Sequence, residues 1–154
     1  MRIRIVCVGR LKERHWRDAG DEYLKRLQPY ARVEVIEVPD RDVTADEARA
    51  LSVEADGVLQ ALPASSVVTA LDIGGAARSS EQLAAWLEGL ATAGQSSVTF
   101  VIGGAAGLHQ RVLDRVDERL SLGPLTLPHQ LARVVLLEQL YRAFRIIRGE
   151  PYHR

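Results

Sequence analysis

The sequence predicts an α/β fold with a mainly parallel sheet and helices on both faces. The main reason is that strand-like apolar runs alternate with helical stretches along the whole chain, in the order strand, helix, five times over. The 154 residues are 47% hydrophobic and 26% charged, as in an ordinary globular protein. Because neither a linker nor an internal repeat interrupts the pattern, we expect one domain over residues 1–154.

The strands are recognised by their apolar patterns. Alternation in RIRIVCVG, which turns at Gly9, and again in VEVIEV predicts two strands with one buried face each. SVVTALDI is a β-branched run typical of a buried strand, SVTFVIGG predicts a fourth strand, and LTL before Pro128 predicts a short fifth. The predicted strands are residues 2–9, 33–38, 66–73, 97–104 and 125–127.

Capping patterns, proline and glycine delimit the helices between these strands. Thr44 with Glu47, and likewise Ser79 with Gln82, have the spacing of a capping box that opens a helix. Pro63 ends the first of these two helices, since proline cannot continue a helix. The expected helices are residues 13–28, 44–62, 80–93, 108–120 and 130–148.

Charge is unevenly distributed although the net charge is zero. Residues 1–17 hold six basic residues against one acidic, and residues 129–154 hold five arginines against two acidic residues. Residues 34–62 hold eight acidic residues against two basic. If the two basic ends meet in space they form a polyanion-binding face, whereas chance clustering on a solvated surface explains the pattern equally well.

Several classes of protein and site are disfavoured. No apolar run approaches the ~20 residues that span a bilayer, and the N-terminus lacks a signal-peptide pattern. Cys7 is the single cysteine and lies in a strand-like apolar run. We therefore expect it to be a small buried side chain in a reducing cytoplasm rather than a reactive thiol. We expect no metal site, because there is no second cysteine and the histidines are far apart in sequence. None of the four has a partner at the close spacing of zinc ligands: His15, His109, His129 and His153.

Three strand ends carry the candidate binding chemistry, namely LDIGG, VIGGAAGL and LSLGPLTLPH. Ligands of parallel α/β sheets bind at the carboxyl ends of strands. Backbone N–H groups around Gly103 and Gly104 could hold an anionic or polar ligand, although a tight strand-to-helix turn explains these glycines equally well. Neither a P-loop nor a dinucleotide fingerprint after the first strand is present, so a standard nucleotide site is not expected.

The last helix has two unusual features. Its apolar residues cover nearly the whole circumference, which favours a second copy of the chain packed on the side that the sheet leaves open. Arg142, Arg145 and Arg148 follow at intervals of three and lead into the terminal Tyr152, His153 and Arg154. This spacing fits a stripe of phosphate contacts and fits a solvated face equally well.

LDIGG, VIGGAAGL, LTLPHQLARVVLLEQLYRAFRI and the terminal PYHR together resemble the bacterial ribosomal RNA large subunit methyltransferase H family, of the SPOUT superfamily, over essentially the whole chain. The resemblance implies a C-terminal trefoil knot, a homodimer, and methylation of N3 of a pseudouridine in helix 69 of 23S rRNA on assembled ribosomes. S-adenosyl-L-methionine is the implied methyl donor, with neither DNA nor a membrane as a partner. A SPOUT methyltransferase acting on tRNA and a non-catalytic ribosome-binding factor are the alternatives.

The same resemblance implies the site residues. Tyr152, His153 and His129 are expected around the acceptor base as catalytic candidates, and Arg142 and Arg154 on RNA phosphates, with one subunit's tail completing the other's site. Ala105-Ala106 stands where many members carry Pro-Glu, so no acidic side chain is expected there. The methyl donor is expected to lie against Leu71, Gly103, Gly104, Leu122, Gly123, Pro124, Leu125, Thr126 and Leu127.

Overall fold

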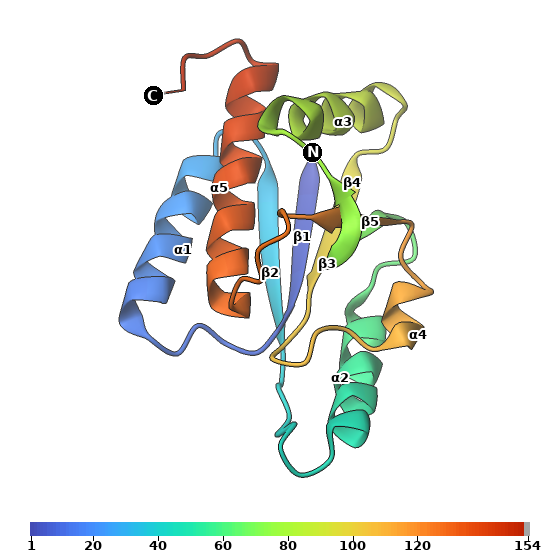
Figure 1. Cartoon of the computed structure of the whole chain (residues 1–154). Helices are drawn as coiled ribbons and strands as arrows, with labels where there is room; N and C mark the ends of the chain where they lie inside the picture. Colours follow the sequence, from blue (N-terminus) through green and yellow to red (C-terminus); the bar gives the residue numbers. More distant parts are fainter. Residues whose placement is uncertain (153–154) are drawn as a thin grey trace.

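The computed structural model describes residues 1–152 as a parallel sheet between two layers of helices (Figure 1). The strands are β1 (Arg2–Val8), β2 (Arg32–Val38), β3 (Val67–Ala77), β4 (Ser97–Ile102) and β5 (Glu118–Ser121). The helices are α1 (Arg14–Leu27), α2 (Glu47–Ala61), α3 (Ser80–Thr92), α4 (Gln110–Leu113) and α5 (His129–Ile147). The strand order is β2-β1-β4-β3-β5 and every pairing is parallel, which confirms the predicted fold class.

Alternation along β1 divides the core between the two faces of the sheet. Ile3, Ile5 and Cys7 point toward the layer of α1, α3 and α5, where they join the larger cluster of buried side chains. Val6 and Val8 point to the other face and pack against α2 and α4. Figure 1 shows α1, α3 and α5 on one side of the sheet and α2 with α4 on the other. No helix among residues 1–152 combines the length and the apolar character needed to cross a membrane.

One of the two predicted capping boxes is confirmed and the other is wrong. The Ser79 hydroxyl accepts from the Gln82 backbone N–H, and the Gln82 side chain accepts from the Ser79 backbone, as predicted for the start of α3. α2 begins at Glu47 rather than near Thr44, because Asp46 caps it and accepts from a backbone N–H. Thr44 is occupied elsewhere, since its backbone N–H and its hydroxyl both donate to Asp42.

The prediction fails most clearly between residues 108 and 127. The expected helix over 108–120 is only the four-residue α4, and the expected strand at 125–127 lies in a loop, whereas the fifth strand is β5. β5 forms because it pairs with β3, which runs on past the expected stop at Gly74 and Gly75. A Cβ at Gly75 would lie 2.6 Å from the Arg119 carbonyl carbon, so the missing side chain lets the two strands approach.

α5 is covered more fully than its sequence pattern predicts. The helix lies between α1 and α3 on the same face of the sheet, which Figure 1 shows (red, between blue and green). This position buries Leu136, Leu137, Leu140, Ala143 and Phe144, while Val134 and Val135 stay partly exposed. The protein's own helices therefore supply much of the cover that we expected from a second copy. The C-terminal trefoil knot stays a prediction.

Cys7 is buried as predicted, with 3% of its surface exposed, and burial raises the pKa of its thiol from 9.0 to about 12. Its contribution to stability is therefore complete below pH 9 and is lost as the pH rises toward 12, because the unfolded thiol ionises first. We expect the free energy of unfolding to fall about 1.4 kcal/mol per pH unit more steeply in the wild type than in Cys7→Ala between those values. Urea unfolding across this range measures it, and parallel curves would contradict the assignment.

Candidate functional site

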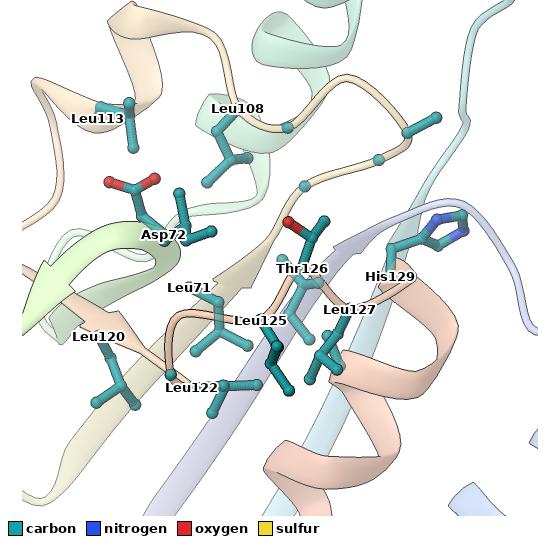
Figure 2. A pocket seen from close by; sticks show the side chains of 18 residues that line it. Leu71, Asp72, Leu108, Leu113, Leu120, Leu122, Leu125, Thr126, Leu127 and His129 are labelled. Carbon is teal, nitrogen blue, oxygen red and sulfur yellow. The ribbon is translucent and has the colours of Figure 1, made fainter. Parts of the chain in front are cut away.

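A pocket of about 280 Å³ lies at the carboxyl ends of β3, β4 and β5 (Figure 2). Three chain segments meet around it: the LDI segment within β3, the glycine-rich loop after β4, and the loop between β5 and α5. The first residues of α5 close one side. Of the residues predicted to contact the methyl donor, the lining contains Leu71, Gly103, Gly104, Leu122, Gly123, Leu125, Thr126 and Leu127. Pro124 is exposed and does not line the pocket.

The glycine-rich loop after β4 is both a tight turn and a wall of the pocket. The Gly107 backbone N–H donates to the Gly104 carbonyl at 3.1 Å, and Gly107 has a φ of +81° that favours glycine. A Cβ at Gly103 would lie 2.5 Å from the Gly107 carbonyl oxygen. The absence of side chains therefore closes the turn, which confirms the tight-turn explanation of these glycines. The loop also lines the pocket, and its role in holding a ligand stays a prediction.

Leucine side chains form the apolar part of the pocket. Leu71, Leu122, Leu125 and Leu127 project into it from β3 and from the loop before α5, as Figure 2 shows. Leu125 is 78% exposed although it is a large apolar residue. Apolar walls with a few polar groups are typical of small-molecule sites.

Asp72 is a lining residue that the sequence reasoning missed. Its carboxylate lies 3.6 Å from the Arg119 guanidinium and its side chain is 24% exposed, so it can still accept hydrogen bonds from a ligand. Thr126 brings a hydroxyl into the same pocket. The signal for Asp72 was present in the sequence, because it directly follows Leu71 at a strand end.

His129 lies at the edge of the pocket, where α5 begins. Figure 2 shows its ring on the far side of the pocket from Asp72 and turned away from the leucines. A Cβ at Gly9 would lie 3.4 Å from the His129 Nε2 atom, so the loop after β1 runs directly beside the imidazole. His129 thus adjoins the binding pocket without filling it.

Tyr152 lies away from the pocket of its own chain. Its hydroxyl donates to the Glu138 carboxylate at 2.6 Å, and the Arg142 guanidinium carbon lies 3.8 Å from the centre of its ring. Glu138 is nine residues after His129, about 14 Å further along α5. Burial, followed by the Glu138 hydrogen bond, raises the pKa of Tyr152 to about 12, so the side chain is a neutral phenol at pH 7. His153 and Arg154 lie outside the described residues.

The predicted arginine stripe on α5 is engaged within the chain. Arg142 donates two hydrogen bonds to Glu138, and Arg145 forms an ion pair with Glu150 at 2.8 Å. Arg148 donates to the backbone carbonyl of Pro29. These arginines pack on aromatic rings, so the end of α5 is a network of stacked arginines and tyrosines formed around Tyr23, Tyr30, Tyr141 and Tyr152.

Comparison with known families matches residues 1–153 to the family described as predicted SPOUT methyltransferase. The chain belongs to the SPOUT methyltransferase family. It is 52% identical to the ribosomal RNA large subunit methyltransferase H of Listeria monocytogenes over 159 aligned positions that cover all of both proteins. It is 48% identical, with the same coverage, to the protein of that name from Carboxydothermus hydrogenoformans. These matches confirm the resemblance drawn from the sequence motifs.

Two solved structures support the fold of this SPOUT methyltransferase. A probable methyltransferase from Bordetella pertussis Tohama I matches with a TM-score of 0.56 at 15% identity, over 92% of this chain and 95% of the other. A probable methylase family protein from Haemophilus influenzae Rd KW20 matches with a TM-score of 0.52 at 16% identity, over 99% of this chain and 70% of the other. At such low identity the likeness bears on the fold alone.

Proposed function

We propose that this SPOUT methyltransferase transfers a methyl group from S-adenosyl-L-methionine to large-subunit ribosomal RNA in the cytoplasm. The proposed acceptor is N3 of a pseudouridine in helix 69 of 23S rRNA, on the assembled ribosome. The observation that carries the proposal is the meeting of three motif segments around one pocket, in a chain whose full-length relatives are named as ribosomal RNA large subunit methyltransferases.

The pocket residues fit this methyl donor. When bound, S-adenosyl-L-methionine supplies an electrophilic methyl group on a positively charged sulfur. Leu71, Leu122 and Leu127 offer apolar walls for a flat base, and the backbone around Gly103 admits close approach because a side chain is missing there. Asp72 can accept hydrogen bonds from hydroxyl or amino groups. Most of the catalysis then comes from holding donor and acceptor in line.

A proton must leave N3 of the acceptor base, so a base or a group that stabilises the uracil anion is required. The phenol of Tyr152 is protonated at neutral pH because its pKa is raised to about 12, and its hydroxyl donates to Glu138, so Tyr152 is not a base. We therefore assign Tyr152 to holding the acceptor base. A histidine, His129 or His153, is the better candidate for receiving the proton, because the unprotonated nitrogen of a neutral imidazole is a hydrogen-bond acceptor.

The position of the tail supports a homodimer with shared sites. Tyr152 packs on Glu138, far along α5 from the pocket of its own chain, so the proposed contact with the acceptor base needs the pocket of a second copy. The partly exposed Val134 and Val135 on α5 supply apolar surface for the contact between the copies. Light scattering is expected to give twice the chain mass of 17.0 kDa; a monomer at micromolar concentration would remove the shared site.

Titration calorimetry with S-adenosyl-L-methionine tests the proposed function at its first step. One donor molecule bound per pocket is expected. No binding would contradict both rRNA methylation and tRNA methylation as the function. Transfer assays with labelled donor then compare ribosomes with isolated tRNA. Methyl transfer to ribosomes alone supports the proposal, whereas transfer to tRNA alone would show that tRNA is the substrate. Donor binding without transfer to either RNA would contradict the proposed activity.

A further inference from the structure

The face of the sheet that α2 covers is left open at the amino ends of the strands. α2 packs on Val6 and Val8 near the carboxyl end of β1, and it stops at Ala61, before Pro63. Beyond its end lies a groove of about 540 Å³, which we call the amino-end groove. Its polar lining consists of Arg2, Arg4, Arg32, Glu34, Ser65 and Ser97.

The charge of the amino-end groove is positive. Arg4 donates to Glu34 at 3.0 Å and also to the Ala61 carbonyl, so the one carboxylate in the lining is neutralised. Arg2 and Arg32 are exposed, and within residues 1–152 neither guanidinium lies within ion-pair distance of a carboxylate. Two positive charges therefore remain after the internal pair is counted.

These two arginines are held next to each other by the sheet. Arg2 of β1 and Arg32 of β2 are register partners on neighbouring parallel strands. Like charges placed directly opposite on adjacent strands destabilise a sheet, so an anion bound between them would relieve the repulsion. A second hollow of about 410 Å³ shares Arg2 and Arg32 with the groove, which extends the positive surface around the edge of the sheet.

Hydroxyl groups add neutral hydrogen-bond donors and acceptors. Ser65 is exposed at the rim and Ser97 lines the groove. The Ser97 hydroxyl donates to the Ser66 hydroxyl at 3.4 Å, and the Ser66 hydroxyl oxygen lies 2.9 Å from the hydroxyl oxygen of Thr99. Arginine and serine side chains are both among the groups that contact phosphate oxygens in protein–nucleic acid complexes.

We propose that the amino-end groove binds the phosphate backbone of the substrate RNA at a point remote from the methylated base. The inference rests on the proposed rRNA methylation, and it adds a second RNA contact through Arg2 and Arg32. The groove lies at the opposite end of the strands from the donor pocket, about 23 Å away along the seven residues of β1. A large folded RNA reaches both points, whereas a short oligonucleotide at the pocket does not, which gives a physical reason for preferring ribosomes.

The test compares the double variant Arg2→Ala/Arg32→Ala with the wild type in ribosome methylation and in binding to 23S rRNA. We expect a raised KM for ribosomes, an unchanged kcat and unchanged donor binding. Between 50 and 200 mM salt, wild-type RNA affinity is expected to fall about tenfold more than that of the variant, because two phosphate contacts are lost. Arg115→Ala removes an exposed arginine elsewhere on the surface and is the control; its salt dependence should match the wild type.

Two further measurements separate the competing explanations. Arg2→Lys/Arg32→Lys keeps the charge and is expected to restore most of the salt dependence. Equal salt dependence of RNA affinity for the wild type and the alanine variant would overturn the proposal. A binding defect seen with ribosomes but not with protein-free 23S rRNA would also overturn it, since the groove would then contact a ribosomal protein. If the wild type failed to bind the donor or to transfer a methyl group, the proposed function would be wrong. The comparison of RNA binding would still test the groove.

Discussion

Gly103→Ala is expected to remove most of the activity by distorting the pocket that we propose for the methyl donor. An added Cβ would lie 2.5 Å from the Gly107 carbonyl oxygen and 2.6 Å from its carbon, and backbone atoms in a tight turn cannot give way as a flexible side chain could. The loop must therefore move, and a displacement of about 1 Å at a positioning site costs roughly 100-fold in rate. Calorimetry with the donor and kcat/KM with ribosomes measure the loss.

Gly89→Ala is the matched control for this change. Gly89 lies inside α3, and a Cβ there would meet nothing within 4 Å. Alanine is favoured over glycine in a helix by about 1 kcal/mol, so the control should be as stable as the wild type or more stable, with unchanged donor binding. If Gly103→Ala bound the donor as well as Gly89→Ala does, the assignment of the glycine-rich loop to the donor would be wrong.

Deletion of residues 152–154 is expected to reduce methyl transfer to background while donor binding stays intact. The pocket proposed for the donor is formed by segments of β3, β4 and β5 and the start of α5, none of which contains the deleted residues. The deletion removes the tail proposed to hold the acceptor base. Calorimetry with the donor and transfer to ribosomes measure the two effects separately, and a truncated protein that methylates ribosomes at the full rate would contradict the role of the tail.

Tyr152→Phe provides the milder comparison for the deletion. The ring can still pack against Arg142, but the hydrogen bond to Glu138 is lost. Such a bond to a charged group contributes about 1.5–3 kcal/mol, so transfer is expected to fall by about 10- to 100-fold if this contact orders the tail. A phenylalanine variant as inactive as the deletion would instead give the hydroxyl a direct part in the chemistry.

The sequence predicted the parts of the fold that depend on local pattern. Alternation in RIRIVCV and the capping box at Ser79 describe interactions between near neighbours, and both β1 and the start of α3 are confirmed. β5 was missed because it depends on pairing across the fold, with Thr69 opposite Glu118, and on Gly75 yielding space to a strand more than 40 residues away. No pattern within residues 108–127 carries that information.

The candidate site was likewise predicted only in part from the sequence. Family motifs pointed to the glycine-rich loop and the loop before α5, and the structure brings both to one pocket. The amino-end groove could not be found from sequence, because it exists only where α2 ends short of the sheet edge. The contact of Tyr152 with Glu138 was also missed, since it requires the chain to turn back along α5 after Gly149, whose φ is +64°.

Methylation of ribosomes from a strain that lacks this protein tests the central claim most directly. Purified protein and S-adenosyl-L-methionine are added to these ribosomes, and the 23S rRNA is digested and mapped by mass spectrometry. The account predicts one added methyl group, on N3 of a pseudouridine in helix 69. An unmodified helix 69, or a methyl group found only at another nucleotide, would contradict it.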